Sequence, residues 1–302
     1  MPPPRTTPNA LWPIRTAFLV ATLGLFAGCA VSHKTAVKPP AVAPLLLTAT
    51  KQDLIARYNA AASSITSLDA TTTLQLTAGS SYTGVIEQYH EVKAFILASR
   101  PANIRMVGQA PIVGKNIFDM ASDGQSFEIF IPSKNEFLTG PTNFERKASK
   151  PIENLRPQHL IGALFWPSIP AGSIVLMEES SDATPAYVLT VATRSTAAGS
   201  DDWRIVLKIS FERTNLTISR IQTLSEEGAI ISDVQLGHWQ LSGATSYPRE
   251  ISLSRPADDY HLRISLTKLS LNQPIEADKF QLTQPEGSRL VRVGPDVPES
   301  QP

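Results

Sequence analysis

Hydrophobic and polar residues alternate with a period of two along most of the chain after residue 69. Such alternation is typical of β-strands that bury one face and expose the other. The pattern predicts strands at 71–79, 82–99, 103–109, 116–124, 126–132, 134–140, 173–180, 186–193, 203–212, 216–224, 229–237, 247–255 and 260–271, with a short last strand between 274 and 293. The spacing between strands, about 8–14 residues, favours an antiparallel sheet or a partly open barrel over alternating strands and helices.

Two segments repeat their hydrophobic residues with the period of an α-helix instead. The segment 50–68 carries one apolar stripe, and Thr50 followed by Asp53 resembles an N-terminal cap. The second segment begins near Pro151 and is ended by Pro167. The stripe of the first segment consists of Leu54, Ile55, Tyr58, Ile65 and Leu68. This helix fits equally well a role in core packing and a role as a lid over a cavity.

The N-terminus resembles a bacterial lipoprotein signal peptide. Arg5 and Arg15 precede an uncharged stretch at 16–28, which suits a signal-peptide core of about 7–15 residues better than a membrane span of about 20. Ala27 and Gly28 come directly before Cys29, and LFAGCA resembles a lipobox, with Phe26 where Leu is usual. The alternative is an ordinary buried or free cysteine. The lipobox predicts that residues 1–28 are removed and that Cys29 becomes the lipidated first residue.

Lipidation at Cys29 implies a protein that is anchored to a membrane and faces the periplasm. More than one acyl chain is needed for stable anchoring, and a lipoprotein cysteine carries several. Ala30 follows the cysteine, where Asp often marks retention in the inner membrane, so we expect the outer membrane. Residues 29–48 contain three prolines and predict an extended tether, which at ~3.1 Å per residue reaches about 60 Å.

Composition fits one globular domain and excludes several classes of protein. The chain has 302 residues, of which 42% are hydrophobic, with 27 basic and 27 acidic residues and one cysteine. A chain this apolar is not disordered throughout, and it has no basic excess for binding nucleic acid. Loss of Arg5 and Arg15 leaves the mature chain slightly acidic. We expect a single domain at 49–293 and a disordered tail at 294–302.

No arrangement of residues in the sequence indicates an enzyme or a cofactor. The five histidines lie too far apart for a metal pattern, and His90–Glu91 lacks the second histidine of HExxH because Ala94 takes its place. Paired acids such as Glu226–Glu227 lie at predicted turns or strand ends, where neighbouring side chains point to opposite faces. We therefore predict no cofactor and no catalysis. An envelope hydrolase with a site assembled from scattered acids and histidines is the less favoured alternative.

The order of the elements resembles the LolA/LolB-like lipoprotein carriers. Three segments carry the resemblance: RPANIRMVGQAP from Arg100, SDGQSFEIFIPSKNEFLTG from Ser122, and PIEADKFQLTQPEGSRLV from Pro274, whose Phe-x-Leu resembles a closing strand. The resemblance implies a mainly β (α+β) fold, an antiparallel half-open barrel covered by the N-terminal helix and a helical insertion. It also implies a cavity that holds acyl chains of lipids or lipoproteins.

The inner faces of the predicted strands supply candidate residues for such a cavity. The candidates are Leu74, Leu76, Ile104, Met106, Phe127, Ile129 and Ile131. Strands with one apolar face must bury it, but periodicity alone does not distinguish a hollow barrel from a filled one. A filled barrel would suit a non-catalytic scaffold that binds an envelope protein partner.

The segment 109–114 resembles a loop of the outer-membrane receptor in the same family. In that loop a Pro-Leu-Gly-like turn projects an apolar side chain needed for inserting cargo. The match makes Ile112, or else Val113, the projecting residue, with one extra residue between Pro111 and Gly114. The alternative is an ordinary hairpin in which Ile112 packs into the core.

Overall fold

A computed structural model describes residues 45–80, 85–88, 91–143, 155–180, 184–195 and 201–294. These residues belong to one compact unit that begins at Leu45. The predicted signal peptide, Cys29, the tether as far as residue 44 and the tail from residue 295 lie outside the described residues. Neither described helix is long and apolar enough to cross a membrane.

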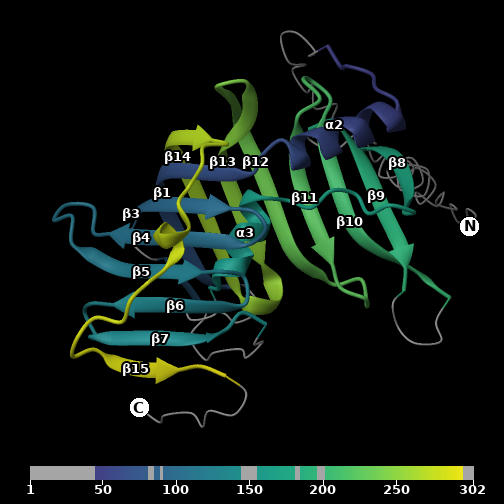
Figure 1. Ribbon diagram of the computed structural model, residues 1–302. Helices are drawn as coiled ribbons and strands as arrows, with labels where there is room; N and C mark the ends of the chain where they lie inside the picture. Colours follow the sequence, from purple (N-terminus) through teal and green to yellow (C-terminus); the bar gives the residue numbers. More distant parts are fainter. Residues whose placement is uncertain are drawn as a thin grey trace, which may run out of the picture. The chain divides into compact units, whose positions relative to one another are not determined.

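The described strands form a single sheet that is open and strongly bent (Figure 1). Its order is β15-β7-β6-β5-β4-β3-β1-β14-β13-β12-β11-β10-β9-β8, and β2 pairs with the end of β1. All the described strand pairs are antiparallel except β15 with β7, which is parallel. The strands are β1 (Ser67–Ser80), β2 (Val85–Gln88), β3 (Val92–Ser99), β4 (Asn103–Gln109), β5 (Asn116–Ser122), β6 (Ser126–Ile131), β7 (Glu136–Pro141), β8 (Ile174–Ser180), β9 (Ala186–Arg194), β10 (Trp203–Glu212), β11 (Ile218–Leu224), β12 (Ile230–Ser242), β13 (Thr245–Arg255), β14 (Tyr260–Leu271) and β15 (Arg289–Arg292). The predicted mainly β class with a half-open antiparallel barrel is confirmed.

The closing segment differs from its prediction. Instead of a strand at Phe280–Leu282, the chain forms a short 3-10 helix, η3 (Ala277–Phe280), in which Phe280 is buried. The carbonyls of Lys279 and Gln281 accept hydrogen bonds from the Arg105 guanidinium, at 3.3 and 3.2 Å. Because side-chain donors from β4 satisfy these carbonyls, the segment crosses the sheet without joining its ladder. Only β15 adds a strand.

The first helix, α2 (Lys51–Ser63), is shorter than the predicted 50–68. Its N-terminus has the expected cap: Thr50 accepts from the Asp53 amide at 3.2 Å, and the Asp53 carboxylate accepts from the Thr50 amide at 3.1 Å. The helix ends early because the chain turns at 64–66 and enters β1, so that Leu68 is a strand residue. Ile65 and Leu68 are both buried, but they lie outside the helix.

The second helix, α3 (Pro157–Leu164), begins later than the predicted start near Pro151. Residues 151–154 lie outside the described part of the chain. Pro157 occupies the first turn, where its missing N–H removes no intrahelical bond. Leu160, Ala163 and Leu164 are buried, so α3 is a core-packing helix.

One apolar face continues across the sheet from strand to strand. Directly paired residues of antiparallel strands point to the same face. One row of such partners runs through Met177, Leu189, Ile209, Ile221, Val234, Leu253, Leu262 and Leu76. A second row runs through Ala70, Ile96, Met106, Met120, Ile129 and Leu138. Most of these side chains belong to one core cluster, which also includes the buried residues of α2 and α3.

Arg100, in the turn between β3 and β4, ties the two helical segments together. Its guanidinium donates to the carbonyl oxygens of Ile65 and Ala62, at 2.9 and 2.8 Å, and to that of Trp166 at 3.1 Å. The Ala62 carbonyl lies in the last turn of α2, where carbonyls lack intrahelical partners, and Ile65 lies just after the helix. Hydrogen bonds from charged groups contribute about 1.5–3 kcal/mol. Arg100 therefore holds the end of α2 and the chain after α3 at fixed places on the sheet.

Candidate functional site

The seven predicted cavity-lining side chains lie on the apolar face of the sheet, as their alternation requires. Leu74, Leu76, Ile104 and Met106 are buried in the core cluster, and Ile129 packs against it. Phe127 is buried, and Ile131 is partly buried. None of the seven lines the pocket that is described below. A role for them in holding a ligand stays a prediction.

The loop between β4 and β5 projects two apolar side chains from the described surface. Ile112 is 97% exposed and Val113 is 75% exposed. The loop closes tightly: the Gly114 amide donates to the Ala110 carbonyl at 3.0 Å, and the Ala110 amide donates to the Lys115 carbonyl at 2.9 Å. Gly114 has φ +62°, which glycine adopts without strain. The alternative that Ile112 packs into the core is wrong.

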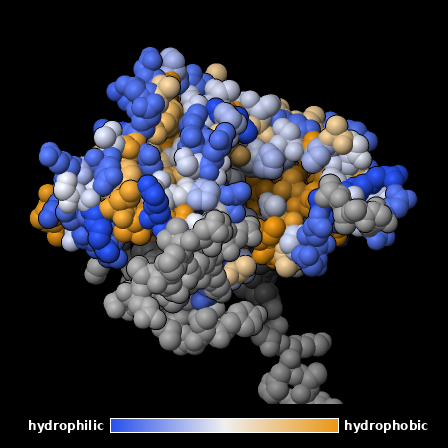
Figure 2. Space-filling model, turned by 60° about the horizontal axis from the view of Figure 1, so that its bottom comes forward, coloured by the Kyte–Doolittle hydropathy of each residue, from blue (hydrophilic) through white to orange (hydrophobic). Residues whose placement is uncertain are grey.

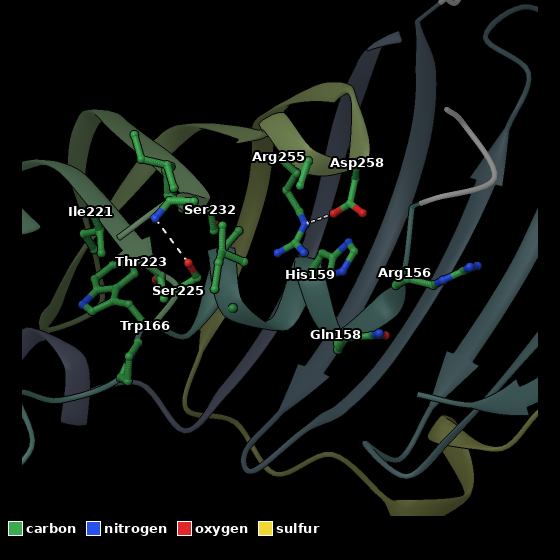
Figure 3. A pocket seen from close by; sticks show the side chains of 18 of the residues that line it. Arg156, Gln158, His159, Trp166, Ile221, Thr223, Ser225, Ser232, Arg255 and Asp258 are labelled. Carbon is green, nitrogen blue, oxygen red and sulfur yellow. Dashed lines mark hydrogen bonds and ion pairs between the residues drawn. The ribbon is translucent and has the colours of Figure 1, made fainter. Parts of the chain in front are cut away.

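A pocket of about 950 Å³ lies beside α3, over the inner face of β11 and β12 (Figure 3). The end of β13 and the short 3-10 helix that follows it, η2 (Pro256–Asp258), form another side of the pocket. In the space-filling view, hydrophobic side chains gather in a hollow on the face that is turned toward the viewer (Figure 2). The pocket combines residues that are about a hundred positions apart in the sequence, so no local motif predicted it.

One part of the pocket has an apolar wall with polar residues beside it. The apolar lining residues are Ala163, Trp166, Pro167, Ile221, Ile230 and Val234, and Thr223, Ser225 and Ser232 lie near Ile221 and Trp166 (Figure 3). Trp166 contacts two aromatic rings: it stacks on Tyr247, with ring centroids 6.0 Å apart, and meets Trp239 edge-on at 6.2 Å. The buried Tyr247 hydroxyl donates to the Leu164 carbonyl at 2.9 Å, which fixes the end of α3 against β13. The wall is therefore preformed.

The other end of the pocket is polar. His159, from α3, has Nδ1 2.7 Å from the Tyr260 hydroxyl, and Arg255 pairs with Asp258 beside it (Figure 3). Burial, and then the nearby Arg255, lower the pKa of His159 to about 3. Burial also raises the pKa of Tyr260. At neutral pH the imidazole is therefore uncharged, and the tautomer sets whether its Nδ1 accepts from the Tyr260 hydroxyl or donates to it.

Two buried polar atoms of pocket-lining residues have no hydrogen-bond partner. They are the side-chain oxygen Oε1 of Gln158 and the indole Nε1 of Trp166. The other end of the Gln158 amide is satisfied, because its Nε2 donates to the Thr142 carbonyl at 2.6 Å. An unsatisfied buried group costs about 1–3 kcal/mol, so such atoms mark places where a ligand or a water molecule would be stabilised.

The described residues offer no metal site: no group of three His, Cys, Asp or Glu side chains among them could hold an ion. The residues of this site that the sequence did not predict are Arg156, Gln158, Trp166, Ile221, Val234 and Arg255. The one available signal was His159, a polar residue placed among the apolar positions of the second predicted helix. Its partner Tyr260 lies 101 residues away, beyond the reach of local patterns.

Among the comparisons with known proteins, the comparison with solved structures gives matches, and these are weak. No known protein family matches the sequence, and no curated protein matches it either. A DUF1329 family protein from Desulfovibrio piger matches with a TM-score of 0.48 and 12% identity, over 76% of this chain and 95% of that chain. A LolA superfamily protein from Nitrosomonas europaea matches with a TM-score of 0.47 and 10% identity, over 78% of this chain and 99% of that chain. Because both TM-scores are below 0.5, we base the functional proposal on the residues of this chain.

The low pKa of His159 predicts a pH dependence of stability. Its ordinary pKa is 6.5, so below pH 6.5 the unfolded chain takes up a proton that the folded chain does not. The free energy of unfolding therefore falls as the pH falls from 6.5 toward 3, by up to about 1.4 kcal/mol per pH unit. Between pH 7.5 and 5.0 this group alone accounts for a loss of about 2 kcal/mol.

Urea unfolding of residues 30–302 at these two pH values measures the effect. In His159→Gln the loss of stability between pH 7.5 and 5.0 should be smaller by about 2 kcal/mol than in the unchanged protein. The exposed His238 provides the control, as His238→Asn, because its positive φ suits asparagine. An equal loss in the His159→Gln variant and the unchanged protein would contradict the assignment.

Proposed function

We propose that this protein is an outer-membrane-anchored lipoprotein that binds acyl chains of lipids or lipoproteins and delivers them to the membrane. One observation carries the proposal: a pocket of about 950 Å³, lined in part by apolar side chains, lies on the inner face of the half-open sheet, beside α3. Small-molecule sites measure about 300–1,000 Å³ and are mainly apolar, so this pocket has the size of a binding site. Each methylene group buried there contributes about 0.8 kcal/mol.

The proposed role is binding without a chemical step. His159 is the histidine that lines the pocket, and its Nδ1 is occupied by the Tyr260 hydroxyl. A pKa of about 3 also makes its imidazole a weak base at neutral pH. These features favour a carrier over the alternative envelope hydrolase.

Two further features support attachment to a membrane. The lipobox-like segment that ends at Cys29 predicts a lipid anchor, and the tether of residues 29–48 would let the domain move away from the bilayer. The exposed Ile112 and Val113 form an apolar tip suited to entering the surface of a bilayer. In this proposal the tip contacts the membrane while the pocket holds the acyl chain.

A scaffold that binds an envelope protein partner is the second candidate. The observation that favours it is the filled core over β1, β3, β4 and β5, where Leu74, Ile104 and Met106 are buried without lining the pocket. A scaffold needs no lipid, so a test for bound lipid in the purified protein separates the two functions.

Lipid extraction from the purified protein tests the proposed function. Residues 30–302 contain the whole described sheet and both described helices, so we expect them to fold and to purify with bound lipid. Mass spectrometry should detect acyl lipids in near-stoichiometric amount, and a fluorescent fatty acid should bind and displace them. Absence of lipid together with absence of fatty-acid binding would contradict the carrier function and leave the scaffold.

Gly162 offers a matched pair of variants for this experiment. It lies in α3, it lines the pocket, and a Cβ built on it meets nothing within 4 Å. Gly162→Phe should fill the pocket and weaken fatty-acid binding about tenfold, the cost of about two buried methylene groups. Gly162→Ala should bind as the unchanged protein does.

The exposed loop gives a separate prediction about delivery. Ile112→Glu in the full-length protein places a charge where the loop would enter the bilayer, so transfer of bound lipid to acceptor vesicles should slow at least tenfold. Fatty-acid binding in the pocket should not change, because the loop does not line it. Transfer at the unchanged rate would show that the loop has no such role.

A further inference from the structure

Two hydroxyl groups lie on the inner face of the sheet beside the apolar wall of the pocket. They belong to Thr223 and Ser232, which are direct partners on β11 and β12 and line the pocket (Figure 3). Each lies two residues along its strand from a residue of the wall, Ile221 or Val234, so it points to the same face. Two residues of a strand span about 7 Å. A chain that lies on the wall therefore has its first polar group within reach of these hydroxyls.

The charged side chains that line the pocket are engaged within the protein. Arg255 pairs with Asp258. The Arg156 guanidinium lies 5.9 Å from the ring centroid of Phe127, a residue that does not line the pocket. The His159 imidazole is uncharged at neutral pH. A carboxylate that entered the pocket would lose its hydration and compete with these partners for a cation, and burial of a charge without a partner is strongly unfavourable.

The hydroxyls of Thr223 and Ser232 are available to a ligand. Both residues are partly buried, and in the described part of the chain neither hydroxyl has a hydrogen-bond partner. The neighbouring Ser225 differs, because its hydroxyl oxygen accepts from the Ala229 amide at 3.2 Å. A hydroxyl can donate to a carbonyl oxygen, which is an acceptor alone. The two hydroxyls therefore suit the ester carbonyl at the start of an acyl chain.

From these observations we infer that the pocket selects uncharged acyl esters over ionised fatty acids. This inference rests on the proposed acyl-chain binding and adds the chemical form of the acyl group. The chain lies on the apolar wall, and its carbonyl accepts from Thr223 or Ser232. A fatty acid still binds through its chain, but with lower affinity, because its carboxylate loses hydration in the pocket.

Competition between ligands of equal chain length tests the inference. Residues 30–302 are loaded with the uncharged dye N-phenyl-1-naphthylamine, which is then displaced at pH 7.5 by 1-decanoylglycerol, 1-O-decylglycerol or decanoate. The ester, 1-decanoylglycerol, should displace the dye at a concentration about tenfold lower than decanoate. Its displacing concentration should also be about fivefold lower than that of the ether, 1-O-decylglycerol, which lacks the carbonyl.

Removal of both hydroxyls provides the matched variant. The double variant Thr223→Val with Ser232→Ala should raise the displacing concentration of 1-decanoylglycerol about fivefold and leave that of 1-O-decylglycerol unchanged. Thr190→Val is the control and should change neither, because Thr190 alternates with the buried Leu189 and Val191 and does not line the pocket. If the double variant fails to fold, the comparison of the three ligands on the unchanged protein still decides.

The outcomes separate this inference from the proposed function. Displacement by decanoate at the same concentration as the ester, or at a lower one, would overturn the selection against charge and leave acyl-chain binding intact. Equal displacement by the ester and the ether would overturn the contact between the hydroxyls and the carbonyl. Displacement by none of the three ligands would overturn the proposed function itself.

Discussion

The structure depends on one constraint: the apolar face that runs through the paired strands of the sheet must be shielded from water. A strongly bent sheet shields part of this face by turning it inward (Figure 1). The remainder needs helices, and in the described part of the chain α2 and α3 supply them, with 13 and 8 residues. α2 lies beside β8 to β11 (Figure 1), where the Lys51 ammonium donates to the Val175 carbonyl at 3.1 Å, and α3 contacts β4 and β5. Beside α3, over β11 and β12, the cover leaves the pocket. The pocket is the consequence of this incomplete cover.

The position of the helices is set by polar contacts at their ends. Arg100 binds carbonyls at the end of α2 and after α3, and the Tyr58 hydroxyl donates to the Pro167 carbonyl at 2.8 Å. The Tyr247 hydroxyl secures Leu164 from the side of β13. These bonds hold the carbonyls of Leu164, Trp166 and Pro167, at the end of α3 and just after it. The apolar wall that contains Trp166 therefore keeps its shape without a ligand. A preformed wall lowers the cost of ordering on binding.

Alternation in the sequence was sufficient to predict most of the strands, the mainly β class and the buried face of each strand. The ends of helices and strands were harder to predict where the same residue suits two neighbouring elements. Leu68 continues the helical stripe, yet it pairs with Leu271 in the ladder of β1 and β14. Phe280 has the pattern of a strand, yet Arg105 binds the carbonyls on either side of it. In both cases a contact of long sequence separation overrides the local pattern.

The site was less predictable than the fold for a related reason. Periodicity identifies which side chains face inward, but it does not tell which inward-facing residues a helix covers. Leu74, Ile104 and Met106 were therefore natural candidates and lie in the filled part, whereas Ile221 and Val234 share the same face and line the pocket. The polar end joins residues from α3 and from the chain after β13, which only the folded sheet brings together.

Photo-crosslinking tests most directly whether the uncovered part of the face is where acyl chains bind. A fatty acid that carries a diazirine on its chain would be irradiated in complex with residues 30–302, and the labelled peptides would be identified by mass spectrometry. We expect the adducts on α3, β11 and β12, around Trp166, Ile221 and Val234. Adducts confined to β3, β4 and β6, or to the loop at Ile112, would contradict the account.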